Sequence, residues 1–191
     1  MLLKINAPDN IVNEAGGTIN VNGHHNIGMR VDKGSVTTNA TGDPSAVNKN
    51  NIVVKGTANI GMVSNGASKA QNNTGGTITL TGTTGNSAGM YATGGGTVEN
   101  TGIITGSGLT DTTGISVDAG STGTMGTNLG KINLTGNRIA GVYNAGTFTM
   151  TGGTITVDGT GAGVFAKNST GAGAAYADHG VEFAGGARRG G

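Results

Sequence analysis

A repeated pattern with a spacing of 23 to 33 residues runs through most of this chain, and it constrains the fold more than any other feature. The first element reads Ile-x-(Val/Leu)-x-Gly, in "INVNG" at 19–23, "IVVKG" at 52–56, "ITLTG" at 78–82, "INLTG" at 132–136 and "ITVDG" at 155–159. A fourth unit, "GIITG" at 102–106, keeps Ile104 and Gly106 but has Gly102 where Ile is expected. Such repeats are typical of stacked architectures, because one unit cannot bury its apolar side chains alone.

Two more elements follow the first in each unit. The second contains Gly-(Met/Ile/Val), as in "IGMRV" from 27 and "AGMYA" from 88, and the weaker third reads "GTVEN" at 96–100 or "GTFTM" at 146–150. Apolar residues alternate with polar ones and many are β-branched, which is the two-residue period of a strand with one buried face. We therefore predict three short strands per unit, with Gly and Asn at corners that need positive φ angles.

The predicted fold is all-β, a right-handed parallel β-helix (β-solenoid) of about six coils, one for each repeat unit. Stacking would join the inward apolar side chains of all units into one narrow core. The predicted core residues are Ile19, Val21, Met29, Ile52, Val54, Met62, Ile78, Leu80, Met90, Ile104, Ile115, Ile132, Leu134, Val142, Ile155, Val157 and Val164.

The repeat also predicts the domain organisation. Residues 1–15 are expected to be an N-terminal lead-in or partial cap, residues 16–168 the β-solenoid, and residues 169–191 an irregular Gly/Ala-rich tail. The apolar run that follows Met1 is too short for a signal peptide, so any export signal is expected outside this chain, which we interpret as a fragment. Unpaired strand edges at the two ends would permit end-to-end self-association.

Composition argues against several partners and ligands. A net charge of +1 with 11% charged residues gives too weak a field to gather nucleic acid, and no apolar stretch is long enough for direct membrane insertion. The chain has no cysteine, and His24 and His25 have one other histidine, the distant His179, so a zinc site lacks ligands. We expect no metal and no cofactor.

Catalysis by paired carboxylates is a second class of function that we weighed. Many β-helices cleave polysaccharides with clustered acidic residues, but Asp32, Asp118 and Asp158 fall near corners of different units, where stacking would separate them. Asp111 lies close to Asp118 in the sequence, and no basic partner stands near it. The sequence therefore predicts a protein that is not an enzyme, with a carbohydrate-active enzyme kept as an alternative.

Threonine pairs suggest another alternative, an ice-binding β-solenoid. Outward Thr-x-Thr pairs occur in "TITLT" at 77–81 and "TFTMT" at 147–151. An ice-binding ladder needs the pair in every coil, whereas the first two coils read "TINVN" and "NIVVK" and the fourth reads "TGIIT". Outward threonine is also what a solvated strand prefers, so the ladder is expected to be broken.

Aromatic residues are few, and Tyr91, Tyr143 and Phe165 all stand two positions after the glycine of the second element. Strand alternation points them outward as a partial column, interrupted at Ser116. Exposed rings are unusual on a surface of Thr and Asn, so we interpret this column as a possible partner contact for a glycan or a protein. The alternative is that the rings cover a strand edge or a neighbouring loop.

The cadence "GTI.V.G...AGM...G", with its loading of Gly, Thr and Asn, resembles the passenger repeats of type V autotransporters over residues 16–168. The repeats resemble in particular the large repeat-rich adhesin passengers of fusobacteria and related Gram-negative bacteria. This resemblance implies a structural, adhesive rod exported to the cell surface by a parent chain. It also implies that the partners are host or bacterial surface proteins or glycans.

Overall fold

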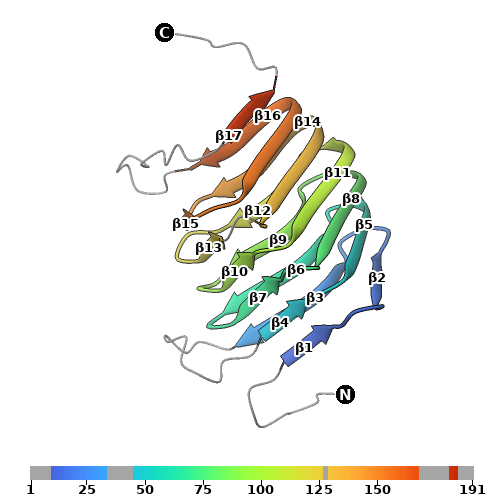
Figure 1. The fold of residues 1–191 in the computed structure, drawn as a ribbon, viewed down its shortest axis with the longest axis vertical. Coiled ribbons are helices and arrows are strands. Elements are labelled where there is room, and N and C mark those ends of the chain that lie inside the picture. Colours follow the sequence, from blue (N-terminus) through green and yellow to red (C-terminus); the bar gives the residue numbers. More distant parts are fainter. Residues whose placement is uncertain (1–9, 34–44, 127–128, 168–180, 185–191) are drawn as a thin grey trace.

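The computed structural model describes residues 10–33, 45–126 and 129–167, together with the backbone of 181–184. Over these ranges the chain forms strands and connecting turns, with every strand pair parallel. Successive strands climb from one end of the molecule to the other, so that each lies beside its counterpart one turn earlier (Figure 1). The chain is thus a β-solenoid of about five turns.

Three faces surround the core. Face 1 is a separate six-stranded sheet of β1 (Asn10–Asn13), β4 (Ser45–Asn48), β7 (Lys69–Asn72), β10 (Thr97–Asn100), β13 (Thr122–Met125) and β15 (Thr147–Met150). Face 2 contains β2 (Thr18–Val21), β5 (Asn51–Thr57), β8 (Thr77–Thr84) and β11 (Ile103–Thr110). Face 3 contains β3 (Ile27–Lys33), β6 (Ile60–Gly66), β9 (Ser87–Thr93) and β12 (Thr112–Val117). Two longer strands, β14 (Lys131–Asn144) and β16 (Thr154–Ala166), bend at the corner and join faces 2 and 3.

The ends of the chain take part in the stack. Strand β1 lies within the predicted lead-in and pairs with β4. Strand β17 (Val181–Ala184) lies within the predicted irregular tail and pairs with β16, which extends face 2 by one more strand. The remaining residues of the predicted tail lie outside the described ranges.

One continuous apolar core fills the space between the faces. Fifteen of the seventeen predicted core residues are buried, and Ile19 and Val164 are partly buried and packed against the same cluster. Alternation explains this pattern, because every second residue of a strand points inward. The core also contains side chains of face 1 that the sequence did not single out, including Ala70, Val98 and Met125.

The predicted alignment of the fourth unit is wrong by two residues. Ile104 pairs with Ile78, and Gly106 pairs with Leu80 and Leu134, so Gly106 occupies an inward position of the strand instead of a corner. A bulge follows between Gly106 and Leu109, and the buried side chain of Leu109 lies about where a Cβ on Gly106 would point, 3.1 Å from it. The side chain of Leu109 thus occupies the core space that Gly106, which has no side chain, leaves empty.

The glycines of the second element have a different role from the one predicted for corners. Gly28, Gly61, Gly89, Gly114 and Gly141 form a column along face 3. A Cβ on any of them would lie 2.5 to 2.7 Å from the carbonyl oxygen of the next glycine in the column. Close approach of the backbone, and not a positive φ angle, therefore excludes a side chain here.

Buried asparagines stabilise the corner between faces 1 and 2. Asn13, Asn48 and Asn72 each donate from Nδ2 to Oδ1 of the asparagine one turn further on, at 2.8 Å, and the ladder ends at Asn100. Their remaining amide hydrogens reach backbone carbonyls of the corner. Because an unpaired buried amide is costly, these shared bonds hold successive turns in one register. Met125 and Met150 continue the same position in the next two turns.

Candidate functional site

The predicted aromatic column lies on the outer side of face 3. In register, Val63 pairs with Tyr91, Tyr91 with Ser116, Ser116 with Tyr143 and Tyr143 with Phe165. We call the four positions from Tyr91 to Phe165 the aromatic row. The rings of Tyr143 and Phe165 are stacked, with centroids 5.5 Å apart and planes 16° apart, and Phe165 is 49% exposed.

Tyr91 differs from the other two aromatic residues. Its hydroxyl donates to the carboxylate of Asp118, which also accepts a hydrogen bond of 2.9 Å from Thr93. Burial, together with the hydrogen bond to Asp118, raises the pKa of the Tyr91 hydroxyl above its ordinary value. Tyr91 is therefore half-buried and engaged by its own protein, whereas the stacked pair of Tyr143 and Phe165 presents the larger free ring surface.

A hollow of about 420 Å³ lies between the aromatic row and the corner of faces 2 and 3; we call it the corner hollow. Its middle consists of small side chains, Thr113, Ala140 and Ala162, which pair with one another across three turns. Tyr143 and Phe165 border it three residues further along their strands. Small residues flanked by large rings thus create a recess on the outer side of face 3.

An ion pair borders the corner hollow on its other side. Arg138 donates from Nε and a terminal nitrogen to the two carboxylate oxygens of Asp111, at 2.7 and 2.6 Å. The hydrogen bonds and charge of Arg138 hold the pKa of Asp111 below its ordinary value. The expectation that Asp111 has no basic partner is wrong, because stacking brings Arg138 over it from the next turn.

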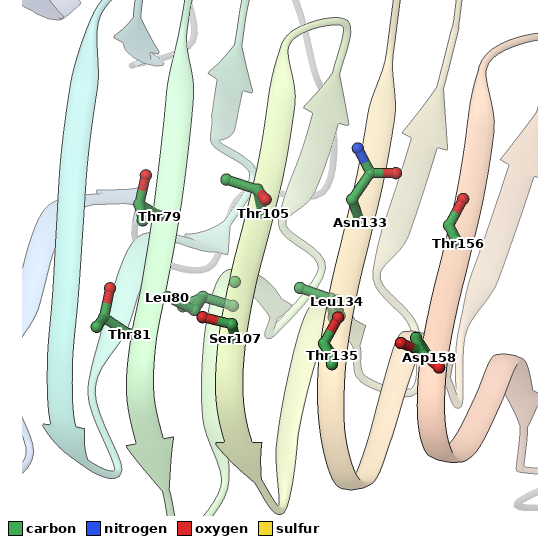
Figure 2. A pocket seen from close by; sticks show the side chains of 11 residues that line it. Thr79, Leu80, Thr81, Thr105, Ser107, Asn133, Leu134, Thr135, Thr156 and Asp158 are labelled. Carbon is green, nitrogen blue, oxygen red and sulfur yellow. The ribbon is translucent and has the colours of Figure 1, made fainter.

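The outer side of face 2 carries two parallel rows of short polar side chains (Figure 2). One row contains Thr79, Thr105, Asn133 and Thr156, and the other contains Thr81, Ser107, Thr135 and Asp158. These rows line a shallow hollow of about 370 Å³. The sequence alignment sets "TGIIT" of the fourth unit beside "TITLT" of the third. The true pairing differs from it by two residues, so Thr105 and Ser107 lie beside Thr79 and Thr81. The pair becomes Asn and Thr in β14, and Thr and Asp in β16.

Several acidic residues outside the corner hollow have structural partners. Asp32 accepts hydrogen bonds from Arg30 and Asn65, and Glu99 forms an ion pair of 2.6 Å with Lys69. Asp118 is engaged by Tyr91 and Thr93 as described above, and Asp158 faces solvent on face 2.

The described residues contain no group of three or more His, Cys, Asp or Glu side chains that could hold a metal ion. His24 and His25 are exposed at the first corner of faces 2 and 3, and His179 lies outside the described ranges.

Three faces of parallel strands around one core define a β-solenoid repeat protein. Comparison with known proteins found no matching family model, curated protein or solved structure. Within the described ranges no helix is long and apolar enough to cross a membrane.

Proposed function

We propose that this chain is a structural and adhesive rod displayed on a cell surface, a passenger segment of a longer exported protein. The observation that carries the proposal is the stacked pair of Tyr143 and Phe165, with Phe165 half exposed on the outer side of face 3. Rings left in solvent are favourable sites for a partner to cover. The stacked strands provide a rigid support that holds these rings outward.

Adhesion can be tested with beads coated with the purified chain and exposed to bacterial and epithelial cells. We expect the wild-type beads to adhere, and the triple variant Tyr91→Ser, Tyr143→Ser, Phe165→Ser to adhere several-fold less. A variant of face 2, Thr79→Ser, Thr105→Ser, Thr156→Ser, is the matched control and should adhere as the wild type does. Full adhesion by the aromatic variant would refute the role of the row, and wild-type beads that bind no cell type would refute the adhesive function.

Export by a parent chain is tested by the DNA on both sides of this coding segment. The proposal expects an upstream signal peptide, further units of the same cadence and downstream amphipathic strands of about ten residues, as in outer-membrane barrels. Stop codons flanking the segment and an unrelated neighbouring gene would contradict it.

The acidic residues support a non-catalytic function. A glycosidase needs a carboxylic acid with a raised pKa as its proton donor. The pKa values of Asp32, Glu99 and Asp111 are instead held below the ordinary range by basic or amide neighbours, against the opposing effect of burial. A screen of polysaccharides for released reducing ends tests this directly, and cleavage by the wild type that is lost in Asp111→Asn or in Asp158→Asn would overturn it.

One observation favours ice binding as a second candidate. The register of β11 places Thr105 and Ser107 beside Thr79 and Thr81, so that two adjacent turns carry paired hydroxyls. Thermal hysteresis of the purified chain measures this function. An activity lost in Thr79→Val, Thr105→Val but kept in Phe165→Ser would assign ice binding to face 2.

A further inference from the structure

We propose that the corner hollow binds one neutral hexopyranose unit of a surface glycan. This inference rests on the adhesive function proposed above and names the ligand class. Two kinds of surface border the hollow, an aromatic pair on one side and an ion pair on the other, with small side chains between them. The hollow has a volume of about 420 Å³ and is open to solvent, so a bound sugar would lie against it with one side in water.

The aromatic side matches the apolar surface of a sugar ring. Axial hydrogens give one face of a pyranose an apolar character, and such a face packs well against an exposed ring. Phe165 is 49% exposed, and its stacking on Tyr143 fixes the orientation of both rings. Ala140 and Ala162 lie beside these rings and leave room for a ligand next to them.

The polar side matches the hydroxyl groups of a sugar. A guanidinium group has five N–H donors, and Arg138 directs donors from two nitrogens to Asp111, so donors remain for a ligand. The carboxylate of Asp111 likewise retains unused lone pairs. Donors and acceptors side by side suit two neighbouring hydroxyls, and Asn86 and Thr113 add an amide and a hydroxyl to the lining.

Charge selects a neutral sugar over an acidic one. Asp111 and Arg138 are the two charged residues of the described lining, and their charges balance. The carboxylate of a uronic or sialic acid would meet that of Asp111, and Arg138 is already paired. A neutral pyranose meets no such repulsion and loses no charge-assisted bond on entry.

Isothermal titration of the complete purified chain tests this inference. The probes are four neutral hexasaccharides (of β1,4-glucose, β1,4-mannose, β1,4-galactose and β1,4-N-acetylglucosamine) and two acidic ones, trigalacturonate and 3′-sialyllactose. We expect saturable binding of at least one neutral probe. Phe165→Ala should weaken it at least tenfold, and Leu129→Ala, which removes an exposed apolar side chain outside the hollow, should leave it unchanged.

Asp111→Gly gives a sharper signature. The φ angle of Asp111 is +49°, which glycine adopts without strain, so the variant should fold, as thermal unfolding will verify. Loss of the carboxylate removes acceptors for the neutral sugar and leaves Arg138 unpaired. We expect the preferred probe to shift from the neutral sugar to trigalacturonate, at least tenfold in the ratio of affinities.

Three results would overturn the inference: no neutral probe binds, an acidic probe binds the wild type more tightly, or Phe165→Ala and Asp111→Gly bind as the wild type does. The bead assay separates this inference from the adhesive function. Wild-type beads that adhere to cells while no sugar binds would refute the sugar site alone. Beads that adhere to no cell while a neutral sugar binds would refute adhesion alone.

Discussion

At the scale of single residues, the corner between faces 2 and 3 uses left-handed backbone in five successive turns. His25, Ala58, Asn86, Asp111 and Arg138 have φ angles between 49° and 64°. Asn, Asp and His tolerate this region better than most side chains, whereas Ala and Arg have no such preference. Strained residues persist when the surrounding structure determines their conformation, and here stacking repeats one corner geometry from turn to turn.

Substituting two glycines distinguishes two reasons why alanine would destabilise the fold, an unfavourable φ angle and a steric clash. A Cβ on Gly61 would lie 2.6 Å from the carbonyl oxygen of Gly89, whereas a Cβ on Gly82 would meet nothing within 4 Å, although φ there is +56°. We expect Gly82→Ala to cost about 1 kcal/mol for its backbone conformation, and Gly61→Ala to cost about 3 kcal/mol by forcing two turns apart. Urea unfolding of both variants measures the difference, and equal losses would contradict this explanation.

At the scale of the elements, Gly106 and Gly123 stand at inward positions of their strands, and a neighbouring side chain lies in the space beside each. Leu109 fills the space at Gly106 in face 2, and in face 1 the ring of Phe148 lies 2.8 Å from where a Cβ on Gly123 would stand. In both cases a large side chain from a neighbouring position takes the place of the missing one, so the core stays continuous where the repeat pattern is interrupted. The strands therefore tolerate an irregular residue when the next strand or bulge supplies the missing volume.

Leu109→Ala should be as destabilising as the loss of a regular core residue. Leu109 is 1% exposed, so the change opens a cavity beside Gly106. We expect the free energy of unfolding to fall by about 3 kcal/mol. Leu129→Ala is the matched control, because Leu129 is 55% exposed and should cost less than about 0.5 kcal/mol. Comparable losses in the two variants would refute the role of Leu109.

The same irregularities limited prediction from sequence. Regular alternation in the first two elements predicted their strands and the inward side of each. The register of the fourth unit was missed because Gly106 resembles a corner glycine, and the buried Leu109 that follows was the available signal. The pairing of Asp111 with Arg138 was missed because loops of variable length hide which residues stack in successive turns.

Face 1 also makes one strand pair sensitive to pH. Burial acts to raise the pKa of Glu99, but the hydrogen bonds of Lys69 and Gln71 and the charge of Lys69 outweigh it, so this pKa lies below its ordinary value. The resulting stabilisation is present above the unfolded-state pKa of about 4.3 and is lost as pH falls through the lower folded-state value.

Glu99→Gln should therefore unfold more easily than the wild type at pH 7, by less than about 1 kcal/mol because both partners are partly exposed. The difference should vanish in acid, below the folded-state pKa of Glu99. Urea unfolding at pH 7, 5 and 2.5 measures it, and a difference that persists undiminished at pH 2.5 would contradict the assignment.

At the scale of the whole molecule, stability depends on contacts between neighbouring turns. Strands β7, β8 and β9 pair on both sides, whereas β1, β2 and β3 pair on one side among the described residues. Each turn contacts mainly the turns directly before and after it, so local opening should begin where one neighbour is missing.

Hydrogen exchange should reveal this gradient along the rod. We expect backbone amides of β8 and β9 to exchange most slowly and those of β2 and β3 faster, because opening the first turn exposes fewer apolar side chains to water. Mass spectrometry of peptides from each turn provides the measurement. Uniform exchange over all turns would show instead that the solenoid opens as one cooperative unit.

The asparagine ladder has a consequence for how such a gene can grow. Tandem duplication adds a whole turn at once, and the new turn must match its neighbours at every corner. A copy inserted among the first four turns places amide against amide at the positions of Asn13, Asn48, Asn72 and Asn100. A copy of these turns inserted after Met125 would press a buried amide between thioethers, with no bonding partner on either side. Recent copies of the asparagine-bearing turns should therefore lie in the part of the chain before Met125, whereas copies of the methionine-bearing turns are not restricted in this way.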